Sequence, residues 1–194
     1  MASILIVCTG NVCRSPIAEA ALRAALTERF GNRAPTVSSA GTAGWEGSGA
    51  VGGSVEAAAE RGHDIGDHVA RMLTPAMVGD ADLVLCMAAE HRDAIRSVAP
   101  DDAAARAFTL KELVRLLEEL PPAARADPEA LAGRVADAAA ARRSGAETNP
   151  WDEDIVDPLG LSMEAIRAIA WEIDAWIQRL VAGLYGPSPA RRVL

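Results

Sequence analysis

Short apolar runs alternate with stretches of helical spacing over the first 120 residues of the chain. The run at 4–7 is rich in β-branched residues and is typical of a buried strand. The same pattern predicts strands at 4–7, 36–39, 82–86 and 106–109, each followed by a helix, at 17–29, 54–61, 90–98 and 111–119. This order, with short connections, predicts an α/β fold with a parallel sheet and helices on both faces.

The second half of the chain departs from this alternation. Residues 121–149 are rich in Ala, Arg and Asp, with one helical stretch at 128–143, and we expect a helical insertion at the surface. Residues 150–161 form a loop dense in acidic residues, proline and glycine. Helical spacing returns over 162–184, where Trp171 and Trp176 are expected to pack rather than to form a binding stripe. The tail after Gly186 is expected to fray.

Composition narrows the class of protein. With 194 residues, 50% of them hydrophobic and 24% charged, the chain is expected to form one globular domain over 1–194. There are 27 acidic and 19 basic side chains, a net charge of −8, which argues against nucleic acid or anionic membranes as partners. We find no apolar stretch of about 20 residues, as a transmembrane helix requires, and no basic leader typical of a signal peptide.

The three cysteines do not form the pattern of a disulfide framework. Cys8 and Cys13 share one short loop, and Cys86 lies in an apolar run. Neither these cysteines nor the three histidines have the spacing of a zinc site. We therefore expect no metal, no cofactor and a reducing, cytoplasmic compartment.

The loop CTGNVCRS at 8–15 joins the first predicted strand to the first helix, for which Ser15 is the expected N-cap and Pro16 the first residue. Backbone N–H groups of a tight loop at a helix N-terminus suit a phosphate dianion, and Gly10 and Asn11 tolerate left-handed backbone. Arg14 can bind two phosphate oxygens through its planar guanidinium. The same positive environment favours a thiolate at Cys8, to which Ser15 can offer a hydroxyl.

Several segments resemble the low-molecular-weight protein tyrosine phosphatases. They are ILIVCTGNVCRSPIAEA at 4–20, SSAGTAGW at 38–45, HVARML at 68–73, ADLVLCM at 81–87, FTLKEL at 108–113 and DIVDPLG at 154–160. The first and last are the most specific. The resemblance implies a four-stranded parallel sheet, which agrees with the four predicted strands, and a phosphate-binding loop between the first strand and the first helix.

The resemblance also assigns roles. It implies a nucleophile at Cys8, a transition-state clamp at Arg14 and a general acid at Asp157, with the phosphate bound by the loop residues Thr9, Gly10, Asn11, Val12, Cys13, Arg14 and Ser15. Asn11, Ser39 and His68 match positions that hold this loop in shape. Cys13 matches a residue able to form a reversible disulfide with Cys8.

A general acid is required by the chemistry itself, because the leaving group needs a proton in the first step. The simpler alternative is that Asp157 only forms a turn before proline, as most Asp-Pro pairs do. Sequence spacing alone leaves Asp152, Glu153 and Asp154 as rivals, and the family match favours Asp157.

The resemblance bears on the substrate at four positions. Trp45 occupies the place of a cleft-wall residue, and Leu159 stands where many family members carry an aromatic side chain. Thr9 is small and polar at the rim. Protein-arginine phosphatases of the same family carry threonine at the position of Val12, so valine favours phosphotyrosine, with phosphoarginine as the alternative.

Other functions have weaker support. The segment GSGAVG at 47–52 matches the dinucleotide-binding pattern, but it does not directly follow a strand. A thiol-linked arsenate reductase would need a further relay cysteine, and Cys86 has no partner after it. A non-catalytic phosphate-binding module is the alternative of a different class. The expected activity is hydrolysis of a phosphorylated protein through a phosphocysteine intermediate.

Overall fold

The computed structural model describes residues 2–99, 101–123, 126–145 and 152–187. Its centre is one parallel sheet of four strands, β1 (Ser3–Cys8), β2 (Thr36–Gly41), β3 (Leu83–Cys86) and β4 (Ala107–Thr109), in the order β2-β1-β3-β4. The predicted fold class and strand positions are confirmed. Because β2 and β3 lie on opposite sides of β1, the chain changes direction across the sheet at the carboxyl end of β1, where α/β proteins bind ligands.

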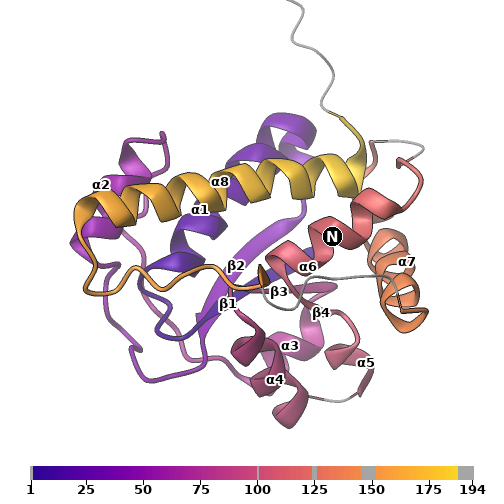
Figure 1. Ribbon diagram of the computed structural model, residues 1–194, viewed down its shortest axis with the longest axis horizontal. Coiled ribbons are helices and arrows are strands. Elements are labelled where there is room, and N and C mark those ends of the chain that lie inside the picture. The colour runs from indigo at the N-terminus through magenta and orange to yellow at the C-terminus, as the bar shows by residue number, and fades with distance from the viewer. Residues whose placement is uncertain (1, 100, 124–125, 146–151, 188–194) are drawn as a thin grey trace, which may run out of the picture.

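Helices cover both faces of this sheet (Figure 1). Side chains alternate along β1, so Ile4 and Ile6 face one hydrophobic cluster, while Leu5 and Val7 face the other. The larger cluster packs against α1 (Arg14–Phe30), α2 (Gly52–Ala59), α6 (Leu110–Glu119) and α8 (Met163–Tyr185). The smaller one packs against α3 (Pro75–Asp80), α4 (Ala89–Val98) and α5 (Asp101–Ala104). The short elements α3, α5 and η1 (Gly31–Arg33) were not predicted from the sequence.

The helical stretch predicted at 128–143 is present as η2 (Pro128–Ala130) and α7 (Leu131–Arg143). Its apolar face is part of the main core, since Leu131, Val135, Ala138 and Ala139 are buried there. Helix α7 contacts α6 and β3, so it is less of a surface feature than the sequence suggested. The rest of 121–149 lies partly outside the described residues, and its status as an insertion stays a prediction.

The long final helix follows its predicted pattern, with one exception. Its apolar positions Ile166, Ile169, Ile173, Ile177 and Leu180 are buried as expected. Trp171 is 61% exposed, so the prediction that it packs was wrong. A position two residues after Ile169 lies on the opposite side of an α-helix, which is why the indole faces solvent. Trp176 is partly buried, and the centre of its ring lies 3.9 Å from the Cζ of Arg179.

Within the described residues, no helix combines the length and apolar composition that crossing a membrane requires. The tail expected to fray lies mostly outside the described residues.

Candidate active site

The predicted loop between β1 and α1 is present and lies at the carboxyl edge of the sheet. Helix α1 begins at Arg14, before the expected start at 16–17, with Cys13 at the N-cap. The prediction that Ser15 caps the helix was wrong, because Ser15 is already in the first helical turn. Its hydroxyl lies 2.9 Å from the Cys8 Sγ instead. Pro16 is tolerated there since the N–H groups of the first turn have no partner within the helix.

Cys8 ends β1 with its Sγ surrounded by donors. The backbone N–H of Asn11 points at this sulfur from 3.3 Å, and the Ser15 hydroxyl contacts it. The Asn11 N–H donates to the sulfur, and the Ser15 hydroxyl is placed to share a hydrogen bond with it at the base of the loop.

Asn11 is the residue that shapes the loop. It has a φ of 56°, the one positive φ among the described non-glycine residues. Its Nδ2 donates to the hydroxyls of Ser15 (2.9 Å) and Ser39 (2.8 Å), and its Oδ1 accepts from the Arg71 N–H (2.9 Å). The His68 Nε2 donates to the Asn11 carbonyl over 2.7 Å. The structure thus brings Ser39 and His68 to the predicted loop.

Two polar supports of the loop were not predicted. The Arg71 N–H donates to the Asn11 side chain, and the Glu19 carboxylate accepts a 2.5 Å hydrogen bond from the Ser39 hydroxyl. Gly41 is needed for close packing, because a Cβ there would lie 2.7 Å from the Thr9 carbonyl oxygen. Neither support has a local sequence signature, since both depend on contacts between distant segments.

Arg14 connects the loop to the segment near the carboxyl end of the chain. Its guanidinium is buried, with 4% of the side chain exposed. One terminal nitrogen donates to the Ile155 carbonyl (3.0 Å), and the other donates to the Thr9 hydroxyl (3.1 Å) and to the Asp157 Oδ2 (2.5 Å). Asp157 stays 46% exposed, so its carboxylate can be reached from solvent.

A pocket of about 50 Å³ opens above these groups. It is lined by Cys8, Thr9, Gly10, Val12, Cys13, Arg14, Trp45, Asp157 and Leu159. The predicted nucleophile, clamp and acid therefore meet in one place, together with the two predicted cleft residues. The exposed side chains of Trp45 and Leu159 supply apolar walls.

The three rival acids lie elsewhere. None of them lines the pocket, and each has another partner among the described residues. Asp152 pairs with Lys111 and Arg115, Glu153 pairs with Arg92, and Asp154 accepts from the Ala89 N–H over 2.7 Å. Asp157 alone of the four candidates lies beside Cys8 and Arg14 in the pocket.

His91 belongs to the site and was not predicted. Its side chain is 1% exposed, and its Nε2 lies 3.0 Å from the Thr9 hydroxyl that contacts Arg14. Burial, reinforced by the Arg14 cation, lowers the pKa of His91 to about 4, so the imidazole is neutral at pH 7. A lone histidine early in a helix carries no motif, so the sequence offered no signal for this contact.

The other two cysteines are also buried thiols. Burial raises the pKa of Cys13 and of Cys86, so both are protonated at neutral pH. Cys8, Cys13 and Cys86 are all free, and the pairing of Cys8 with Cys13 stays a prediction. In the described ranges, no three His, Cys, Asp or Glu side chains are grouped so as to hold a metal ion.

Comparisons with known proteins agree with this geometry. The family model described as low molecular weight phosphotyrosine protein phosphatase matches residues 3–121, more than half of the chain. The low molecular weight protein-tyrosine-phosphatase of Streptomyces coelicolor is 38% identical over 121 residues, which cover 62% of this chain and 70% of that protein.

Solved structures extend the similarity beyond the matched sequence. AmsI of Erwinia amylovora, a tyrosine phosphatase, is 42% identical over 103 residues, which span 50% of this chain and 64% of AmsI. Its crystal structure superposes with a TM-score of 0.67 at 28% identity, covering 94% of this chain and 92% of AmsI. The YwlE arginine phosphatase from Geobacillus stearothermophilus superposes with a TM-score of 0.67 at 29% identity, covering 93% and 91%. The chain belongs to the low-molecular-weight phosphotyrosine protein phosphatase family.

Proposed function

We propose that this protein is a cysteine-dependent protein-tyrosine-phosphatase that hydrolyses phosphate monoesters through a phosphocysteine intermediate. One observation carries the proposal: Cys8, Arg14 and Asp157 line a single pocket at the carboxyl end of β1. A nucleophile, a cation for the phosphoryl oxygens and a proton donor are the three groups that this reaction needs.

In the first step, the Cys8 thiolate attacks phosphorus in line with the leaving group. The S–P bond forms as the P–O bond to the tyrosyl oxygen breaks, and Asp157 gives its proton to that oxygen. Arg14 and the loop N–H groups stabilise the charge on the remaining phosphoryl oxygens. The Nε of Arg14 is buried without an acceptor among the described residues, so the guanidinium has a further donor for a bound anion.

In the second step, the Asp157 carboxylate takes a proton from water, and the resulting hydroxide oxygen bonds to phosphorus. The S–P bond breaks, and its electron pair returns to Cys8 as a thiolate. The Ser15 hydroxyl, 2.9 Å from the sulfur, can donate a hydrogen bond to this leaving thiolate. Inorganic phosphate then leaves the loop.

The contact with Arg14 holds the Asp157 carboxyl group at the pocket before substrate binds. A phosphate dianion that enters the loop competes for the same Arg14 donors and lies close to this carboxyl group. Binding of the phosphate therefore takes place beside the group that is proposed to protonate the leaving oxygen.

The pocket walls support phosphotyrosine as the substrate. Trp45 and Leu159 offer apolar surface to an aromatic ring, and Val12 presents no hydroxyl to a guanidinium. Phosphoarginine is the alternative, since the arginine phosphatase YwlE has a similar fold. Membership of the family implies a phosphorylated protein as the partner, and we propose no nucleic acid and no membrane partner. A cytoplasmic location would keep the three free thiols reduced.

The test is phosphate release from phosphotyrosine, phosphoarginine and phosphoserine peptides, in EDTA with a reductant, beside a Cys8→Ser control. We expect release from phosphotyrosine that disappears in the variant. Preference for phosphoarginine would keep the thiolate chemistry and overturn the substrate. No release from any peptide by folded protein would favour the arsenate reductase or the phosphate-binding module. If Cys8→Ser loses the activity of the wild type but still binds the phosphopeptide, the protein is an enzyme rather than a phosphate-binding module.

A further inference from the structure

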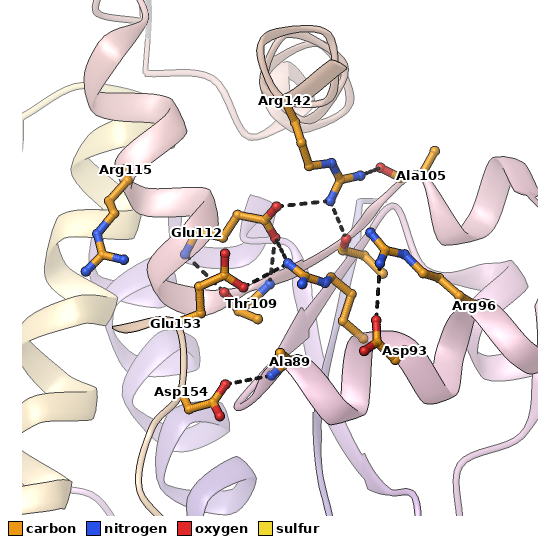
Figure 2. A network of polar contacts seen from close by, with 12 residues as sticks. Ala89, Asp93, Arg96, Ala105, Thr109, Glu112, Arg115, Arg142, Glu153 and Asp154 are labelled. Carbon is orange, nitrogen blue, oxygen red and sulfur yellow. Dashed lines mark hydrogen bonds and ion pairs between the residues drawn. The ribbon is translucent and has the colours of Figure 1, made fainter. Parts of the chain in front are cut away.

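Four charged side chains, which come from Arg92, Glu112, Arg142 and Glu153, form a largely buried network of polar contacts (Figure 2). The Nη1 of Arg92 donates to the Oε2 of Glu112 (2.8 Å) and to the Oε2 of Glu153 (3.0 Å). On its other oxygen, Glu112 meets the Nη1 of Arg142 at 3.5 Å. The network therefore joins four parts of the chain: α4, α6, α7 and the segment 152–161 that carries Asp157, which we call the acid loop. It contains two cations and two anions.

The burial of this network makes it costly to disturb. Glu112 is 2% exposed and Glu153 is 4% exposed. Without Arg92 between them, two carboxylates would be left close together and away from water, and removal of one partner from such a buried pair is strongly destabilising. Glu112 is further fixed by the capping box with Thr109 at the start of α6. Glu153, where the network meets the acid loop, is therefore held in one position.

The network acts on Asp157 over a short length of chain. Glu153 precedes Asp157 by four residues, a span of about 14 Å at most when extended. Between the two, the Ile155 N–H donates to the Met87 carbonyl (2.8 Å), and the Ile155 carbonyl accepts from Arg14. A shift at Glu153 would therefore move the segment that holds both the Asp157 carboxylate and a partner of Arg14.

Arg142 brings α7 into the same arrangement. Its guanidinium donates to the carbonyls of Ala107 and Ala105, each over 2.9 Å, and lies 4.1 Å from the centre of the Phe108 ring. Helix α7 lies beyond residues 3–121, which the family model matches. The predicted insertion thus contributes a cation to the group that holds the acid loop.

We propose that Glu153 is a positioning residue for the general acid, and that Arg142, acting through Glu112 and Arg92, completes its support. The inference rests on the proposed phosphatase function. Catalysis is sensitive to placement, because a displacement of about 1 Å can cost a factor of about 100 in rate. Glu153 does not touch the substrate pocket, so it acts through Asp157.

The experiment compares kcat/KM for phosphotyrosine and for p-nitrophenyl phosphate, whose nitrophenolate leaves without needing a proton. The variants are Glu153→Gln and Arg142→Met. The control is Arg96→Met, which removes an exposed arginine of α4 that pairs with Asp93 outside the network. Because kcat/KM reports the first chemical step, its ratio between the two substrates measures proton donation. A loss of folded protein lowers both values equally and leaves the ratio unchanged.

For Glu153→Gln we expect kcat/KM to fall by about 10-fold on phosphotyrosine and by less than about 2-fold on p-nitrophenyl phosphate. Arg142→Met should change the ratio in the same direction, by about 3-fold. Arg96→Met should leave it unchanged. Equal losses on both substrates, or an unchanged ratio in both variants, would overturn the proposal. If Glu153→Gln does not fold, Arg142→Met and Arg92→Lys provide the same comparison.

Failure of the proposed function gives a different result. If the wild-type protein hydrolyses neither substrate, the phosphatase assignment fails before any variant is compared. If the wild type is active and Cys8→Ser is not, an unchanged ratio in the variants counts against the positioning role alone.

Discussion

The guanidinium of Arg14 and the carboxylate of Asp157 meet at 2.5 Å, although 143 positions separate them in the chain. This contact joins the start of α1 to the acid loop directly beside Cys8. It places the proposed phosphate clamp and the proposed proton donor in contact before a substrate arrives.

Replacing Asp157 with alanine should lower kcat/KM for phosphotyrosine by about 100-fold, because general acid catalysis contributes on that scale. The loss on p-nitrophenyl phosphate should be much smaller, since its leaving group needs little protonation. Steady-state kinetics on both substrates measure the two losses. Asp137→Ala is the control, because Asp137 is an exposed carboxylate of α7 that does not line the pocket. Equal losses on the two substrates would remove Asp157 as the acid.

Asn11 should be sensitive to its side chain and to its backbone conformation. We expect Asn11→Ala to reduce the free energy of unfolding by about 2–4 kcal/mol, because three side-chain hydrogen bonds are lost and alanine is strained at positive φ. Asn11→Gly removes the same hydrogen bonds without strain from a Cβ, although glycine makes the unfolded chain more flexible. Urea unfolding of both variants separates the two effects. A wild-type stability in Asn11→Ala would show that the loop is held by other contacts.

His91 should make the protein less stable in mild acid. Its folded-state pKa is lowered to about 4, by burial first and by the Arg14 cation second, against 6.5 for the free side chain. Below pH 6.5 the unfolded chain binds a proton at this histidine, whereas the folded protein binds it only near pH 4. The stabilising contribution of the neutral imidazole is therefore present above pH 6.5 and is lost as the pH falls. Asp154 and Asp157 oppose the shift.

The measurement for His91 is the unfolding free energy of wild type and His91→Gln at pH 7, 5.5 and 4.5. We expect the advantage of the wild type to shrink with falling pH. Other groups, such as Asp174, titrate in both proteins and cancel in the difference. A pH-independent difference between the two proteins would show that His91 keeps an ordinary pKa.

Gly10 should control the position of the cleft wall. A Cβ at Gly10 would lie 2.7 Å from the Cδ1 of Trp45, so Gly10→Ala must displace the indole. We expect KM for a phosphotyrosine peptide to rise by about 5-fold as apolar contact with the ring is lost. Gly44→Ala is the control, since a Cβ there meets nothing within 4 Å. An unchanged KM in Gly10→Ala would mean that Trp45 does not bind the substrate ring.

Much of the fold was readable from the sequence because its signals are local. The apolar run of β1 predicts a buried strand, and the segment from Cys8 to Arg14 contains its own strand end, loop and helix start. The order of alternating strands and helices then leads to a parallel sheet with the loop at its carboxyl edge. A nucleophile and a clamp separated by six positions are brought together by the loop itself.

Other features depended on segments that meet only in the folded chain. Sequence spacing alone could not separate four neighbouring acids, and only the family resemblance favoured Asp157. In the structure, Asp157 lines the pocket and Glu153 is buried against Arg92. The contact of His91 with Thr9 and the reach of Arg142 to Glu112 have no sequence pattern. Ser15 does not cap the helix as expected, whereas its hydroxyl lies 2.9 Å from the Cys8 Sγ, as the loop sequence indicated.

The division has a physical reason. Backbone preferences and the burial of apolar faces act over a few residues, so the sequence by itself determined the succession of strands and helices along the chain, the loop and its two reactive residues. The partner of a charged side chain depends on which distant groups share its low-dielectric surroundings. Only the tertiary structure decided which carboxylate faces Cys8 and which ones hold the acid loop in place.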